Sequence, residues 1–205
     1  MKTCVGLGLF IGLIVARAAT DSSPPPFTWI DPADPAVRAI RESGERVMDR
    51  VGHTMVYEVE RAVMEQGFSH AIAISHLKDL TLPQTEPDQP RITAIRNTSL
   101  ILRNPANQPD QAEQAALEII NSAIQGGLDV PAILVQRLDP PNAPSEWRVY
   151  RAITTKPICL QCHGPSEELL PAVRSILNSK YPEDKATSYT AYQWRGVIRV
   201  SLAKP

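Results

Sequence analysis

Apolar and polar positions divide the chain into stretches with helical and strand-like periodicity. The longest helical pattern runs from about Pro35 to Gln66, where apolar side chains recur every three or four residues and form one stripe. Asp34 is a suitable N-cap and Pro35 suits the first turn, while Gly67 predicts the end of the helix. The stripe consists of Val37, Ile40, Gly44, Val47, Met48, Val51, Met55, Val59 and Ala62.

The pattern changes after residue 68, with a short helix expected from Ser69 to about Leu80 and strands dominating afterwards. Alternation of polar and apolar side chains predicts strands at residues 91–96, 132–138, 146–154 and 196–202. Two more helices are expected, one from Asp110 to Gly126 and one capped by Ser166 that reaches about Lys180. Because strands and helices do not alternate regularly, the order predicts an α+β domain with an antiparallel sheet.

The first residues have the pattern of an export signal. Lys2 gives a positive start, and the apolar run from Cys4 to Ala16 is 13 residues long, shorter than the roughly 20 that span a bilayer. Ala16-Arg17-Ala18 then fits a small-x-small cleavage site. We therefore expect a signal peptide at 1–18, a Pro-rich linker at 19–35, and one domain at 36–205, in a periplasmic or otherwise exported protein. The mature chain would have no membrane span; an uncleaved anchor is the alternative.

Composition bounds the class of protein. Of the 205 residues, 43% are hydrophobic and 21% are charged, which is typical of a soluble domain with its own core. The formal net charge is −1. A nucleic-acid surface needs a clear excess of Lys and Arg, so we expect no nucleic-acid partner.

The cysteines single out one motif. The chain has three, and removal of a signal peptide would leave only Cys159 and Cys162. Residues 159–163 read Cys-Leu-Gln-Cys-His, the signature of c-type haem attachment. Two thiols at this spacing reach two vinyl groups of one porphyrin, and the adjoining His163 is placed to bind the iron. The motif predicts one haem c per chain, held by Cys159 and Cys162 with His163 as proximal ligand.

Three other interpretations of the motif stay open. A zinc site could combine it with a distant histidine. A thioredoxin-like redox pair would open a helix after a strand in a βαβ unit. The third is a plain structural disulfide.

The sequence around the motif, Tyr150 to Pro165, resembles a family of PAS-like c-type haem domains known from cyanobacteria and other bacteria and long catalogued as a domain of unknown function. Residues 71–74, 102–110, 117–118 and 181–196 look like further blocks of that family, and the resemblance covers roughly residues 40–202. It implies a PAS-like antiparallel sheet flanked by helices, with a long N-terminal helix. A cyanobacterial source would make the thylakoid lumen a further location.

The second axial ligand departs from the family pattern. The resemblance implies a distal Cys shortly after an Ala-Ile-x-Val-like run, but Ser75 holds that position, and a hydroxyl is a poor iron ligand. His76 is favoured instead, since at 100° per residue it lies about 40° from Ile72 around the helix. His53 and His70 lie away from the apolar faces. The remaining alternatives are a methionine, namely Met48, Met55 or Met64, or an open site.

Four arginines are candidates to pair with haem propionates, because a guanidinium matches a carboxylate fork. An ordinary solvated role is favoured for any single one. They are Arg91, Arg96, Arg103 and Arg151.

Single-electron transfer with an unidentified redox partner is the leading functional prediction. The alternative is a haem-based redox or gas sensor that acts through a signalling partner. Catalysis is not expected, because no distal acid–base pair can be read from the sequence.

Overall fold

The structure of the chain is a computed structural model that describes residues 26–74 and 88–204. The expected signal peptide, residues 19–25 of the expected linker, and Ser75 with His76 lie outside the described residues. Among the described residues, no helix is long and apolar enough to span a membrane.

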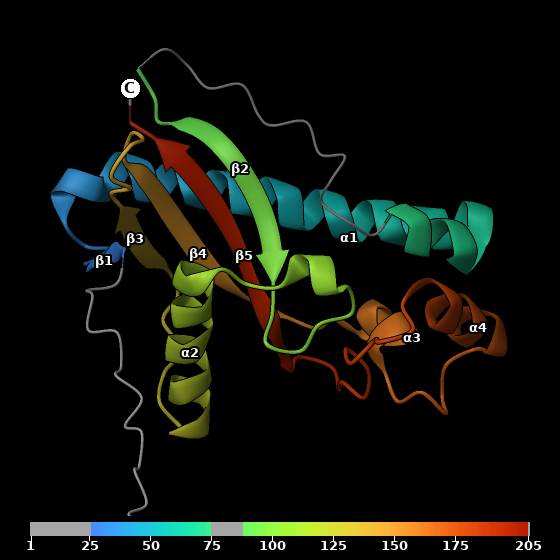
Figure 1. The fold of residues 1–205 in the computed structure, drawn as a ribbon. Coiled ribbons are helices and arrows are strands. Elements are labelled where there is room, and N and C mark those ends of the chain that lie inside the picture. The colour runs from blue at the N-terminus through green and yellow to red at the C-terminus, as the bar shows by residue number, and fades with distance from the viewer. Residues whose placement is uncertain (1–25, 75–87, 205) are drawn as a thin grey trace, which may run out of the picture.

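Five strands form one sheet in the order β1-β3-β4-β5-β2, and every neighbouring pair is antiparallel (Figure 1). The predicted α+β class is confirmed. The strands are β1 (Phe27–Ile30), β2 (Arg91–Thr98), β3 (Leu134–Leu138), β4 (Glu146–Thr154) and β5 (Trp194–Ala203).

The edge strand β1 lies inside the segment that was expected to be a linker. Phe27 pairs with Leu138 and Ile30 with Val135, so β1 satisfies backbone groups along the outer edge of β3. Four residues are too few to show a period of two against the prolines around them. The ordered sheet therefore begins nine residues before Ala36, where the domain was expected to start.

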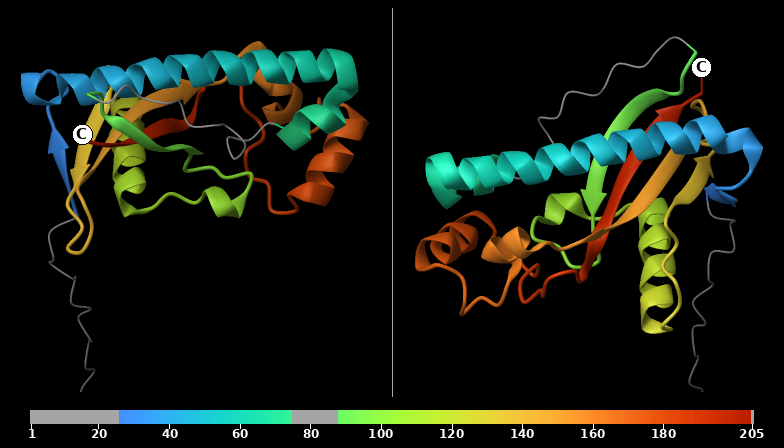
Figure 2. Two further views of the ribbon diagram at one scale, coloured as in Figure 1. Left: turned by 90° about the horizontal axis from the view of Figure 1, so that it is seen from above. Right: turned by 180° about the vertical axis from the view of Figure 1, so that it is seen from behind.

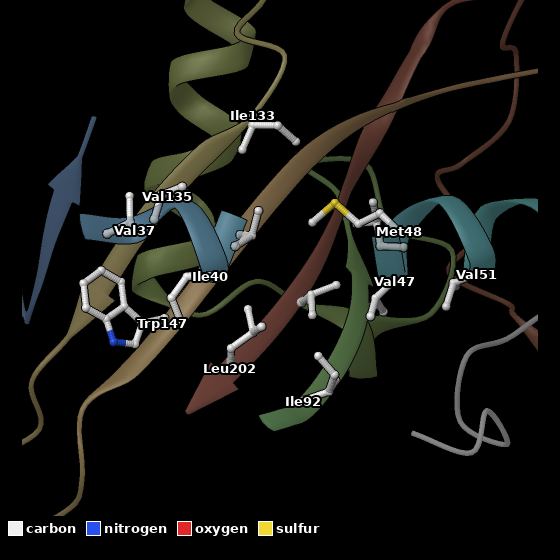
Figure 3. Close-up of a cluster of buried hydrophobic side chains, with 13 residues drawn as sticks. Val37, Ile40, Val47, Met48, Val51, Ile92, Ile133, Val135, Trp147 and Leu202 are labelled. Carbon is white, nitrogen blue, oxygen red and sulfur yellow. The ribbon is translucent and has the colours of Figure 1, made fainter. Parts of the chain in front are cut away.

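One face of the sheet is covered by α1 (Arg38–Ile74), which follows the 3-10 turn η1 (Pro35–Val37) capped by Asp34 (Figure 2). The predicted apolar stripe is confirmed, since its first half forms the main core with the inward residues of the strands (Figure 3). The buried members are Val37, Ile40, Val47, Met48, Val51, Ile92, Ile133, Val135, Trp147, Val149, Ile198, Val200 and Leu202.

Gly67 interrupts α1, as its position in the sequence predicted. Its φ of 77° and ψ of 177° are not helical, and the chain after it folds back toward α4 (Pro171–Lys180) (Figures 1 and 2). The expected second helix is present as residues 68–74, and its continuation lies outside the described residues.

The opposite face of the sheet is covered by α2 (Gln111–Gln125), with Leu117 and Ile120 against Tyr150 and Val197. Asp110 caps this helix as predicted, and with Glu113 it forms a full capping box. Unlike the α1 face, this face also buries ion pairs.

The remaining elements are η3 (Pro105–Asn107), η4 (Pro157–Cys159) and α3 (Leu160–His163). The prediction that Ser166 caps the last helix is wrong, because α4 begins at Pro171. Leu170 has an extended ψ of 136°, the conformation that a following proline imposes. Proline is itself favoured in the first helical turn, so Pro171 sets the start.

Candidate cofactor site

The cysteine motif lies beyond one end of the sheet, where β4 ends and β5 begins (Figure 1). Buried Thr155 ties the two strands together there. Its hydroxyl donates to the carbonyl of Thr190 at 2.6 Å, and its own carbonyl accepts from the N–H of Tyr192 at 2.8 Å. Pro157 then starts the short turns that carry the motif. The end of the sheet therefore serves as a fixed base for η4 and α3.

Both cysteines are half-buried free thiols. They are three residues apart across consecutive helical turns, a spacing that places side chains on one face. The sulfur of Cys159 accepts from the N–H of Lys156 at 3.3 Å. Cys162 packs against the cluster around α4, formed by Ile72, Leu169, Val173 and Leu177. Burial raises the pKa of the Cys162 thiol, which is therefore held protonated.

His163 ends α3 with its imidazole held in one orientation. Its Nδ1 lies 2.7 Å from the carbonyl oxygen of Ala186. A carbonyl can only accept, so Nδ1 carries the hydrogen and the lone pair is on Nε2. Burial, together with the charges of Arg103 and Arg195, lowers the pKa of His163 to about 3. The ring is therefore neutral at physiological pH, the form that binds a metal.

Residues 184–189, which we call the backing loop, also hold the backbone of the motif. The N–H of Tyr189 donates to the carbonyl of His163, and the N–H of Ser188 to that of Gly164, both at 2.9 Å. The buried ring of Tyr189 meets the imidazole edge-on, with centroids 6.1 Å apart. Arg195 lies over the same tyrosine ring at 5.3 Å. The imidazole is thus fixed through both its side chain and its main chain.

Arg103 joins the motif to the backing loop. Its side chain is only 14% exposed, and its Nε donates to Asp184 at 2.8 Å. Its Nη2 donates to the carbonyl of Cys162 and contacts that of Ala186 at 3.4 Å. The favoured solvated role is therefore wrong for Arg103.

The other candidate arginines take part in different contacts or face solvent. Arg96 pairs with Glu113 at 3.3 Å, Arg151 pairs with Asp49, and Arg91 is exposed. None of these contacts involves the cysteine motif.

Sequence reasoning missed Asp184, Ala186 and Tyr189 as site residues. All lie in the block at 181–196 that resembles the haem family. Their roles depend on contacts across the fold, so the resemblance was the available signal.

The alternative iron ligands that the structure describes are either exposed or packed in the core beneath α1. His53 and His70 are exposed on α1, as expected for solvated histidines. Met48 is buried in the core beneath α1, and Met64 is 80% exposed. The favoured ligand, His76, lies outside the described residues and stays a prediction.

The other interpretations of the motif find no counterpart in the described residues. Every strand pairing in the sheet is antiparallel, so the strand before the motif is not part of a parallel βαβ unit. The two cysteines are not joined in a disulfide. Within 26–74 and 88–204, no group of three or more His, Cys, Asp or Glu side chains is arranged to hold a metal ion.

One comparison with known proteins identifies the family of this chain. A family described as Tll0287-like matches residues 36–203, which confirms the predicted resemblance. A solved structure, the crystal structure of the cyanobacterial heme-protein Tll0287, matches with 20% identity and a TM-score of 0.40. That match covers 54% of this chain and 61% of the other. A search of curated proteins found no match.

Proposed function

This chain belongs to the Tll0287-like family, and from that premise we propose that it is an exported protein that binds one haem covalently and carries single electrons. Cys159 and Cys162 would hold the porphyrin, and His163 and His76 would bind the iron. Bound haem supplies an iron centre that exchanges one electron.

The observation that carries this proposal is the state of His163. Its imidazole is neutral, half-buried and oriented by the carbonyl of Ala186, which leaves Nε2 as the ligating atom. This hydrogen bond to a carbonyl is the support that iron-binding histidines receive in metalloproteins. A Cys-x-x-Cys pair that did not bind haem would not require this hydrogen bond.

Attachment follows from the chemistry of the two thiols. Each S–H adds across a vinyl C=C bond, so that sulfur bonds to one vinyl carbon and the hydrogen goes to the other. No oxidant or reductant is consumed. The free thiols of Cys159 and Cys162 are in the reduced state that this addition needs.

The position of the motif supports electron transfer. Gln161, between the two cysteines, is exposed, and the motif lies on the surface at the end of the sheet. The iron ligand is nevertheless held rigidly by the backing loop, so its geometry changes little between redox states. Export is supported by the apolar run from Cys4 to Ala16, and covalent attachment prevents loss of haem outside the cell.

Covalent attachment is tested on full-length chain produced in cells that have a haem-attachment system. After a denaturing gel, the wild type should stain for haem peroxidase activity, and the double variant Cys159→Ala/Cys162→Ala should not. Cys4→Ala, which lies in the expected signal peptide, is the matched control and should stain like the wild type. Mature protein that is colourless, or that releases its pigment to acid acetone, would contradict the proposal.

The second ligand is tested by spectroscopy of the reduced protein. With His76 on the iron, the ferrous spectrum is six-coordinate and carbon monoxide leaves it unchanged, whereas His76→Ala binds the gas rapidly. If His76→Ala leaves the spectrum unchanged, His76 is not an iron ligand. Rapid gas binding by the wild type would favour a sensor over an electron carrier.

A further inference from the structure

Arg103 joins three parts of the site that are distant in sequence. It follows β2, yet its guanidinium contacts Cys162, 59 residues later, and Asp184, 81 residues later. The side chains of Arg103 and Asp184 are 14% and 9% exposed. This pair is therefore largely shielded from water. In such a low-dielectric environment, a charge acts strongly on its neighbours.

A continuous set of hydrogen bonds runs from this pair to the imidazole. The second carboxylate oxygen of Asp184 accepts from the N–H of Ala186 at 2.8 Å. The carbonyl of Ala186 accepts from Nδ1 of His163, and Nη2 of Arg103 approaches the same oxygen at 3.4 Å. Arg103 also holds the carbonyl of Cys162, the residue directly before His163.

We infer that Arg103 and Asp184 are positioning residues that orient His163 and, through their opposite charges, set the reduction potential of the haem. The inference rests on the proposed function, because it requires His163 to be an iron ligand. It concerns two residues that do not touch the iron themselves.

The two partners should shift the potential in opposite directions. A nearby positive charge disfavours ferric iron, so Arg103 raises the reduction potential and Asp184 lowers it. Arg103 also competes for the carbonyl of Ala186, which weakens the hydrogen bond from His163. A weaker bond leaves less negative charge on the imidazole, which again favours ferrous iron.

The test measures the reduction potential of haem-loaded, full-length protein by spectroelectrochemical titration. Arg103→Gln should lower the potential, and Asp184→Asn should raise it. Asparagine keeps an oxygen for the N–H of Ala186, so the second variant retains the backing loop. Electron paramagnetic resonance of the ferric forms should show altered g values in both, because these depend on the orientation of the imidazole.

Arg137→Gln is the matched control. Arg137, on β3, pairs with Asp139 at 2.9 Å, but these side chains are 45% and 50% exposed, whereas those of Arg103 and Asp184 are largely buried. It lies at the opposite end of β4 from the motif, about 25 Å away along the nine-residue strand. Its substitution should leave potential and g values unchanged.

The outcomes separate the inference from the proposed function. If the wild type carries no covalent haem, both the proposed function and the inference are wrong. If the wild type carries haem but neither variant changes the potential, the inference alone is wrong. It is also wrong if both variants shift the potential in the same direction, which is what a general loosening of the site would do. Should Arg103→Gln fail to accumulate, Asp184→Asn decides by itself, since an unchanged or lowered potential contradicts the assigned charge effect.

Discussion

Gly44 lies where α1 crosses β4, and the lack of a side chain sets how closely the helix approaches the sheet. A Cβ at this position would lie 2.7 Å from the Cβ of Val149. Gly52, two turns later on the same helix, has no atom within 4 Å of such a Cβ. The same substitution therefore has opposite consequences at two positions of one helix.

We predict that Gly44→Ala destabilises the protein by about 1–3 kcal/mol, because the core must open to admit the methyl group. Gly52→Ala is the matched control and should stabilise by up to about 1 kcal/mol, since alanine is the better helix former. Urea unfolding followed by circular dichroism measures both. Equal effects at the two positions would contradict this account of the helix–sheet contact.

At the scale of the element, the break in α1 determines where the chain meets the site. Gly67 turns the chain so that residues 68–74 pack on α4, where buried Ile72 joins the cluster that includes Cys162. Residues 68–74 therefore lie beside the motif, and a helix continued straight through Gly67 would carry them away.

Replacing Gly67 with alanine should cost about 2–3 kcal/mol, because its φ of 77° and ψ of 177° belong to a region populated almost only by glycine. Gly127, with φ of 63° and equally open surroundings, is the comparison. Its substitution should cost only about 1–2 kcal/mol, the usual cost of a left-handed residue. The midpoints of thermal unfolding rank the two, and a larger loss for Gly127→Ala would contradict this explanation.

On the scale of the whole molecule, the two faces of the sheet are stabilised differently. The α1 face is mainly apolar, with its ion pair of Asp49 and Arg151 more exposed, whereas the α2 face buries Glu113 among arginines. Glu113 is fully buried with Arg96 and Arg199 each 3.3 Å away, and Arg148 pairs with Asp110 and Glu146. The α2 face therefore contains carboxyl groups whose protonation should affect stability.

Acid should weaken the fold through this face. Burial raises the pKa of Asp110 and Glu146, but hydrogen bonds outweigh it and lower both pKa values; Asp110 accepts from Arg148 and the N–H of Glu113, and Glu146 from Arg148 and Ser201. A carboxyl with a lowered pKa contributes stability that is present above its ordinary pKa, near 4, and is lost as the pH falls through the folded-state value.

We therefore expect the urea midpoint of the haem-free protein to fall gradually below about pH 6.5, because the unfolded state protonates His163 while the fold keeps it neutral, and to fall more steeply below about pH 4, where the two carboxyls add to the loss. The double variant Asp110→Asn/Glu146→Gln should show a shallower fall. Asp49→Asn, at an exposed ion pair on α1, is the control and should follow the wild type. A double variant with the wild-type slope would place the acid sensitivity elsewhere.

Much of this protein could be predicted from the sequence, because the signals were local. Helical and strand periodicity depend on neighbours a few residues apart, and they located α1 with its stripe, α2 with its cap, and the antiparallel strands. The Cys-x-x-Cys-His motif is five residues long, so the chemistry that it predicts is equally visible in the chain. The family resemblance, carried by several such blocks, was confirmed.

Tertiary structure alone decided what depends on residues distant in the chain. A four-residue strand such as β1 forms because it pairs with the edge of β3. Arg103 is not an ordinary solvated arginine, because folding places Asp184 against it. The orientation of His163 likewise depends on Ala186, 23 residues later. Periodicity indicates which face of an element is buried. It does not indicate which distant residue lies opposite that face, because this depends on the packing of the whole chain.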